Sequence, residues 1–366
     1  MEPDKKKDHE EKLLNIISKL LNIIVCLMIL AAVLVYVNFA GIPEVFLPKK
    51  KSAVVVETIP DAKKEEPLAD AVWVAPDTAF IPKDEKGDQI RYGRMLIANT
   101  AFYLGPHGTI QQTSNGMNCQ NCHLNAGTKP FGNNYSAVAS TYPKFRERSG
   151  MIENIYKRVN DCFERSLNGT ALDTLGKEMQ AIKAYIVWLG QNVKKGEKPK
   201  GAGLTELKYL DRAADPEKGK LIYTEKCRSC HTETGEGKMN ANGLTYQYPP
   251  LWGPHSYNIG AGLYRLSRFA GYVKSNMPFG ASYDSPQLTD EEAWDVAAYI
   301  NSQQRPTKDL SRDWPKMGAK PVDHPFGPYT DKFDEKQHKY GPFQPIADFK
   351  KKQKEKDKST KAVSKN

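Results

Sequence analysis

Two short cysteine-histidine motifs carry most of the chemical information in this sequence. They are Cys119-Gln120-Asn121-Cys122-His123 and Cys227-Arg228-Ser229-Cys230-His231. The Cys-x-x-Cys-His spacing is the attachment signature of c-type haem, in which both cysteines form thioethers and the histidine binds the iron. A zinc site would need a second pair of ligands at defined spacing, and a redox Cys-x-x-Cys motif has no use for the histidine. We therefore expect two covalently bound haem c groups, with His123 and His231 as axial ligands.

The second haem requires another axial ligand unless its iron binds substrate, and that ligand strongly affects the reduction potential. Met277 precedes Pro278 in the loop before the last predicted helix of the second domain, where a thioether ligand is expected in a cytochrome c. We predict His/Met ligation by His231 and Met277. Met239 and Lys274 are rival ligands, and a methionine of the core with no role on iron is the plain structural alternative.

The first haem has no methionine in an equivalent Met-Pro loop, and Cys162 stands in its place. Four of the six cysteines belong to the haem motifs and Cys26 lies in a long apolar run. Cys162 is therefore left without an intramolecular disulfide partner in an oxidising compartment. It is either a buried inert thiol, half of an intermolecular bridge, or a thiolate ligand of the first haem iron.

The neighbours of Cys162 favour a chemical role. If residues 152–167 are helical, Arg158, Cys162 and Ser166 are spaced by four and share one stripe, and Arg148 comes shortly before that helix. A guanidinium beside a thiol stabilises the thiolate and also binds small oxyanions through paired donors. Pairing with haem propionates is the alternative role for the arginines. The stripe indicates an anion site with a sulfur nucleophile at its centre.

The elements that must position these residues follow one pattern used twice. An amphipathic helix is expected before each haem motif, over 90–104 and 216–226, and a closing helix after it, over 178–193 and 290–303. Thr289 and Glu292 form a predicted capping box at the start of the last of these helices. We predict a mainly α fold with two cytochrome c class I type domains in tandem, over 86–200 and 204–305.

The N-terminus contains an uncharged apolar run over 20–39, long enough to cross about 30 Å of hydrocarbon as one helix. We interpret it as a transmembrane anchor, because no small-x-small cleavage site of a signal peptide follows it. Haem attachment at Cys-x-x-Cys-His takes place outside the cytoplasm. We therefore expect a cytoplasmic head over 1–19 and a single pass through the inner membrane, with the haem domains on the periplasmic side. Residues 40–85 are predicted to be a spacer.

The net charge of +10 does not indicate nucleic-acid binding, because most of the excess lies in the lysine-rich segment 350–366. Such a segment is predicted to be a solvated, disordered tail. Residues 306–349 are rich in proline and aromatic residues without helical periodicity, and we interpret them as an extended strap over the haem domains. No nucleic-acid partner is expected.

These motifs resemble those of the thiosulfate dehydrogenases, dihaem c-type cytochromes that couple two thiosulfates into tetrathionate or run the reverse, tetrathionate-reducing reaction. The resemblance runs from about Arg91 to Phe349. It is specific in five stretches: 114–118 (SNGMN), 129–140 (KPFGNNYSAVAS), 142–150 (YPKFRERSG), 158–169 (RVNDCFERSLNG) and 338–343 (HKYGPF).

The resemblance implies roles for individual residues. It implies a catalytic first haem ligated by His123 and Cys162, with Arg148, Arg158 and Ser166 binding substrate. It also implies that electrons pass through the second haem to an acceptor cytochrome c or a membrane oxidase. Some members carry a lysine immediately before the methionine ligand, where this chain has Asn276. A membrane-tethered electron-transfer protein without substrate chemistry is the alternative function.

Overall fold

The computed structural model describes residues 16–32 and 71–363. The chain divides into two units, Met1–Glu66 and Pro67–Asn366, and each is described by itself. In the first unit residues 16–32 form a helix whose large apolar side chains are exposed, among them Leu20, Ile24 and Leu27. Within the described part of the chain no helix combines the length and hydropathy needed to cross a membrane. Residues 33–39 of the predicted anchor, 1–15 of the head and 40–70 of the spacer lie outside that part.

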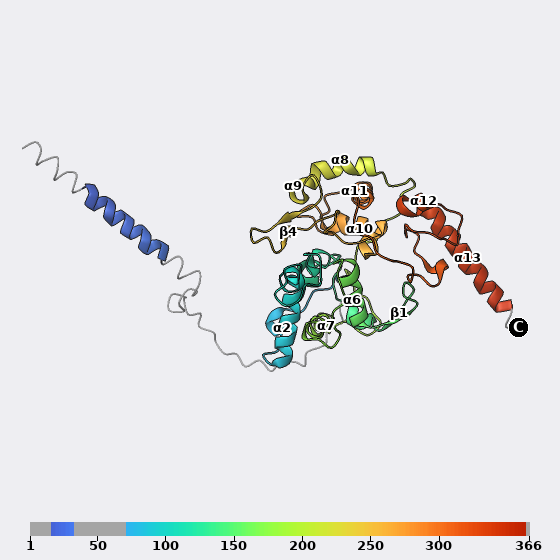
Figure 1. Ribbon diagram of the computed structural model, residues 1–366, viewed down its shortest axis with the longest axis horizontal. Helices are drawn as coiled ribbons and strands as arrows, with labels where there is room; N and C mark the ends of the chain where they lie inside the picture. The colour runs from blue at the N-terminus through green and yellow to red at the C-terminus, as the bar shows by residue number, and fades with distance from the viewer. Residues whose placement is uncertain (1–15, 33–70, 364–366) are drawn as a thin grey trace, which may run out of the picture. The chain divides into compact units, whose positions relative to one another are not determined.

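The second unit is mainly helical, as predicted (Figure 1). Its α-helices are α2 (Glu85–Ala98), α3 (Thr100–Leu104), α4 (Leu124–Gly127), α5 (Val138–Thr141), α6 (Ile155–Arg165), α7 (Lys177–Leu189), α8 (Pro216–Lys226), α9 (Arg228–His231), α10 (Leu266–Asn276), α11 (Asp290–Ser302), α12 (Glu335–Tyr340) and α13 (Gln344–Val363). Strands β1 (Lys144–Arg146) and β2 (Met151–Glu153) form one antiparallel hairpin, and β3 (Lys238–Met239) and β4 (Tyr246–Tyr248) form another. Short 3₁₀ helices are η2 (Thr78–Phe80), η3 (Cys119–Asn121), η4 (Gly262–Tyr264) and η5 (Met317–Ala319).

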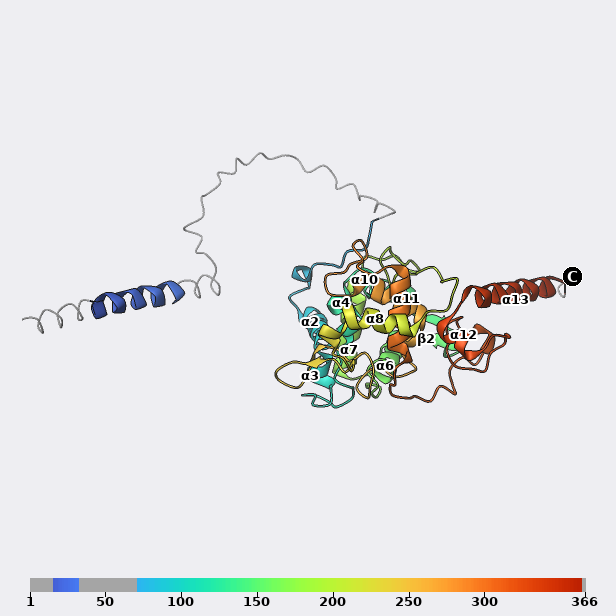
Figure 2. The ribbon, with the colours of Figure 1, turned by 90° about the horizontal axis from the view of Figure 1, so that it is seen from above.

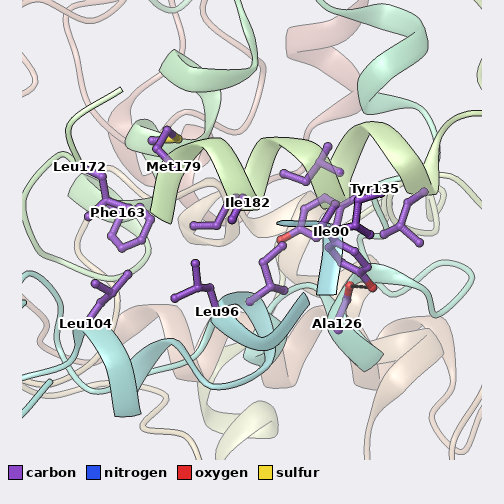
Figure 3. Packing of buried hydrophobic residues seen from close by; sticks show 14 of the residues in the cluster. Ile90, Leu96, Leu104, Ala126, Tyr135, Phe163, Leu172, Met179 and Ile182 are labelled. Carbon is purple, nitrogen blue, oxygen red and sulfur yellow. Dashed lines mark hydrogen bonds between the residues drawn. The ribbon is translucent and has the colours of Figure 1, made fainter. Parts of the chain in front are cut away.

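The first half of this unit is built on the pairing of α2 with α7. The side chain of Asp84 caps α2 by accepting a 2.8 Å hydrogen bond from the backbone N–H of Gly87. Apolar residues of α2 and α3 then point toward α7: Figure 3 shows Leu96 and Leu104 on one side of this core and Ile182 on the other. The first haem motif begins at Cys119, after the loop over 105–118, and Cys119 packs against this core, so the core supports the site.

The second half repeats the arrangement with α8 packed on α11. Helix α8 spans the predicted range and begins at Pro216, a residue favoured in the first turn. The predicted capping box is confirmed at the start of α11. The backbone N–H of Glu292 donates to Thr289 Oγ1 at 3.1 Å, and the carboxylate of Glu292 accepts from the N–H of Thr289 at 2.8 Å.

One glycine at each helix crossing shows how closely the two halves repeat. A Cβ atom on Gly93 would lie 1.9 Å from the carbonyl oxygen of Ala181, and one on Gly219 would lie 1.9 Å from that of Asp295. Both crossings are therefore backbone-to-backbone contacts that leave no room for a methyl group.

We expect Gly219→Ala to destabilise the haem-loaded protein by about 3 kcal/mol or more, because α8 must move away from α11 to admit the methyl group. Thermal unfolding measures this loss. Gly262→Ala is the matched control, since a Cβ at that position meets no atom within 4 Å. Equal unfolding temperatures for the two variants would contradict the close crossing.

The hairpin formed by β1 and β2 shortens a predicted helix. Helix α6 begins at Ile155 rather than at residue 152, because Met151–Glu153 pairs with Lys144–Arg146. Asn154 then caps α6 by accepting a 2.9 Å hydrogen bond from the backbone N–H of Lys157.

Three further segments differ from the sequence-based expectation. Residues 71–85 pack on the first domain instead of acting as a spacer: Trp73 is buried, and its backbone N–H donates to the carbonyl of Lys200 at 2.9 Å. The predicted strap contains α12 and the start of α13. Residues 350–363, expected to be disordered, continue α13, which projects beyond the rest of its unit (Figures 1 and 2). Lysine, glutamate and glutamine are good helix formers, and Ile346 anchors the helix by full burial.

Candidate active site

A cavity of about 300 Å³ opens in the first domain around the first haem motif. Cys119, Cys122, His123 and Cys162 all line it. Its apolar walls come from α2, α5, α6 and α7 and include Ile97, Val138, Phe163, Leu167, Ile182 and Ile186. These residues fit a haem, because the walls suit an apolar macrocycle, the paired thiols suit thioether bonds, and an imidazole and a thiol are available to the iron.

Both predicted histidine ligands are held in the orientation that metal binding requires. His123 Nδ1 lies 2.6 Å from the carbonyl oxygen of Asn133, and His231 Nδ1 lies 2.9 Å from that of Pro249. A ring that donates from Nδ1 to a carbonyl keeps Nε2 unprotonated for the metal. The ring of His123 also stacks on Tyr135, with centroids 4.5 Å apart. This geometry supports the predicted ligand role of both residues.

Cys162 lies in the middle of α6, and its thiol differs from the two attachment thiols. Burial raises the pKa of Cys162, but Arg158, followed by His123, outweighs that effect and lowers it to about 6. Arg158 Nη1 donates a 3.0 Å hydrogen bond to Cys162 Sγ. Burial raises the pKa of Cys119 and Cys122 to about 12. The surroundings of Cys162 thus favour its thiolate form, unlike those of Cys119 and Cys122.

The structure brings together the three residues of the predicted stripe but places Arg148 apart from them. Arg158, Cys162 and Ser166 all line the cavity, and Ser166 is the C-cap residue directly after α6. Arg148 does not line it: its Nη2 atom forms a 2.8 Å ion pair with Asp161, a residue with a 3% exposed side chain. A direct contact of Arg148 with substrate stays a prediction.

The three candidate ligands of the second haem have different surroundings in the structure. Met277 directly follows α10 and packs against the second hydrophobic core, as do Cys227 and Trp252. Lys274 is engaged elsewhere, since its Nζ atom donates to the carbonyl of Leu288 at 2.8 Å and pairs with Asp290 at 2.6 Å. Met239 lies on β3 with 39% of its surface exposed. This placement favours Met277, whose ligation stays a prediction.

The cavity also has a basic lining that the sequence analysis did not identify. Lys144 and Arg146 enter it from β1, Lys198 from the segment between the domains, and Arg268 from α10 of the second domain. Alternation along β1 is the available signal, because positions 144 and 146 of a strand share one face. No comparable signal exists for Lys198 and Arg268, which reach the site only through the tertiary fold.

Comparisons with known proteins identify the two domains and the family of the chain. A cytochrome c profile matches residues 216–304, and a profile described as the SoxA/TsdA cytochrome c domain matches residues 109–194. A thiosulfate dehydrogenase of Psychrobacter arcticus is 39% identical over 67% of this chain and 72% of its own. The chain belongs to the thiosulfate dehydrogenase family. A family member from Allochromatium vinosum is 37% identical over 67% of this chain and 88% of its own.

A solved structure of the same family supports the fold. It is the thiosulfate dehydrogenase (TsdBA) of Marichromatium purpuratum, with a TM-score of 0.60 and 31% sequence identity over 65% of this chain and 50% of that one. The predicted resemblance, the oxidoreductase class of the enzyme and the two covalently bound haem c groups are thereby confirmed. Two cytochrome c domains are also confirmed.

Proposed function

We propose that this protein oxidises two thiosulfate ions to tetrathionate at Cys162 and passes the two electrons on through its second haem domain. One observation carries the proposal: in the cavity that fits the first haem, the sulfur of Cys162 lies 3.0 Å from Arg158 Nη1. A nucleophile of lowered pKa beside a fixed cation is an arrangement suited to reaction with an anionic sulfur compound. The names of the relatives point to the same substrate.

The chemistry balances around the sulfur of Cys162. The thiolate and the outer sulfur of one thiosulfate join in an S–S bond, giving a cysteinyl thiosulfate and releasing two electrons. A second thiosulfate attacks this S–S bond, releases tetrathionate and regenerates the thiolate. When bound, the haems supply the redox chemistry that takes up the two electrons. The second step run backwards is the cleavage of tetrathionate.

The side chains beside Cys162 have separate roles. Arg158 offsets the repulsion between two dianions and holds a sulfonate oxygen. The Ser166 hydroxyl, one turn beyond Cys162, donates to the same group. Arg148 acts through its ion pair with Asp161, and we propose that it also adds to the positive potential at this end of the cavity.

The test is thiosulfate-dependent reduction of ferricyanide by the purified, haem-loaded protein. We expect turnover with one tetrathionate formed per two ferricyanide ions reduced. A protein that neither reduces ferricyanide with thiosulfate nor cleaves tetrathionate when supplied with electrons would be an electron-transfer protein without substrate chemistry.

We also propose that the N-terminal segment anchors the protein in the inner membrane, with the haem domains on the periplasmic side. The support is the exposed apolar surface of the helix over 16–32, which continues into an uncharged sequence up to residue 39. Electrons then leave to an acceptor cytochrome c or a membrane oxidase. Partitioning of the full chain into membranes, compared with a chain starting at residue 71, tests the anchor.

Replacing Met277 tests the path for electrons. We expect Met277→Ala to lower the midpoint potential of the second haem, because a methionine ligand favours the reduced iron. Redox titration followed by visible spectroscopy measures the shift. Met239→Ala is the control and should leave both potentials unchanged; a shift in that variant instead would assign the ligand to Met239.

A further inference from the structure

The cavity beside Cys162 is charged beyond what one thiosulfate requires. Besides Arg158, its lining carries Lys144, Arg146, Lys198 and Arg268, against the single carboxylate of Glu206 among the residues that line it. These basic residues come from three separate parts of the chain. The proposed reaction joins two thiosulfates, each with one sulfonate, into one tetrathionate. The product therefore has a sulfonate at each of its two ends.

Only part of this charge is compensated by the protein. The buried Glu153, with 1% of its side chain exposed, pairs with Arg146: its Oε2 atom lies 3.8 Å from Arg146 Nε. Among the described residues, Lys144, Lys198 and Arg268 form no ion pair with a carboxylate. Lys144 instead lies over the ring of Tyr142, 4.6 Å from its centroid. Cations that outnumber the carboxylates around a cavity favour an anionic ligand there.

The cations are also close enough to affect one another. Burial, followed by repulsion from Arg146, Lys198 and Arg158, lowers the pKa of Lys144 to about 8. Burial, followed by the charge of Arg265, lowers the pKa of Arg268; Glu206 and Asp323 oppose this effect, and Arg158 adds a smaller lowering. Arg158, which contacts Cys162 on its own helix, therefore affects the pKa values of both Lys144 and Arg268.

We propose that Lys144, Lys198 and Arg268 bind the outer sulfonate of the second thiosulfate, which becomes the far end of tetrathionate. Arg158 and Ser166 hold the sulfonate next to Cys162, so the two ends of the product lie in two subsites of one cavity. Arg268 belongs to α10, which makes the second cytochrome c domain part of the substrate site. This inference rests on the proposed function and assigns its second substrate.

The experiment measures tetrathionate binding by calorimetry in the haem-loaded Cys162→Ala protein, where no covalent adduct can form. Lys144→Gln and Arg268→Gln should each weaken binding about tenfold, since each removes a charged hydrogen-bond donor. Lys144→Arg and Arg268→Lys should restore most of the affinity. Lys220→Gln, an exposed lysine of α8 that does not line the cavity, is the charge-matched control and should bind as the parent does.

Pairing of these cations with haem propionates is the competing role. It predicts a shift in the midpoint potential of the first haem with unchanged tetrathionate affinity, and that result would overturn the proposal. Unchanged affinity without any shift would overturn it too, while leaving thiosulfate oxidation at Cys162 intact. If the Cys162→Ala protein bound no tetrathionate at all, the subsite would fail, whereas the proposed function fails only if the wild type also shows no thiosulfate-dependent reduction of ferricyanide.

Discussion

Replacing Cys162 by alanine should reduce thiosulfate oxidation by at least about 1,000-fold while both haems remain attached. Among the residues that line the cavity, Cys162 is the one cysteine outside the attachment motif, and the pKa of its thiol is lowered. Without it no S–S bond to thiosulfate can form. Thiosulfate-dependent ferricyanide reduction measures the loss. Haem content per chain, from the absorbance of the denatured protein, shows whether attachment at both motifs is intact.

Cys26→Ala is the matched control for this variant. It removes the other cysteine outside the haem motifs, which lies in the exposed helix over 16–32, and it should turn over like the parent. Activity retained in Cys162→Ala would exclude the cysteine from the chemistry. Activity lost in both variants would indicate a defect in maturation rather than in catalysis.

Arg158→Gln should lower kcat/KM for thiosulfate by about 100-fold, because one side chain performs two tasks. Its guanidinium donates to Cys162 Sγ at 3.0 Å and is the chief cause that lowers the pKa of that thiol. It also provides the positive charge nearest the reacting sulfur. Loss of both effects makes the nucleophile weaker and the approach of a dianion less favourable.

Arg158→Lys separates charge from geometry. A lysine keeps the positive charge but cannot present the paired donors of a guanidinium, so it should recover only part of the activity. Lys183→Gln, at a half-buried position of α7 over the ring of Tyr156 and outside the cavity lining, is a control for general loss of positive charge. Equal kcat/KM values for Arg158→Gln and Lys183→Gln would contradict the role of Arg158.

The parts of the site that lie on regular elements could be predicted from the sequence. The haem motifs are local, and Arg158, Cys162 and Ser166 follow the period of a single helix, so their shared face is a property of spacing alone. The paired helices of each domain were visible for the same reason. The close crossings at Gly93 and Gly219 were not, since nothing in a single helix shows which partner it approaches.

The remainder of the site depends on contacts between segments far apart in the chain. Asn133 and Pro249 orient the histidines through backbone carbonyls, which carry no mark in the sequence. Arg268 reaches the cavity from the other domain. Arg148 was expected to approach the face of the stripe because it closely precedes the helix in sequence, whereas in the structure it pairs with Asp161. The helical form of residues 350–363 was missed because a high density of lysine was weighed above the helix propensity of the same residues.

The most direct test of the account is the mass of the protein after mixing with tetrathionate and no source of electrons. The Cys162 thiolate should attack the central S–S bond, release one thiosulfate and retain the other as a cysteinyl thiosulfate, which excess thiosulfate then removes. We predict a mass increase of one thiosulfate group in the parent and none in Cys162→Ala. An unchanged mass in the parent, or the same increase in both proteins, would contradict a covalent role for Cys162.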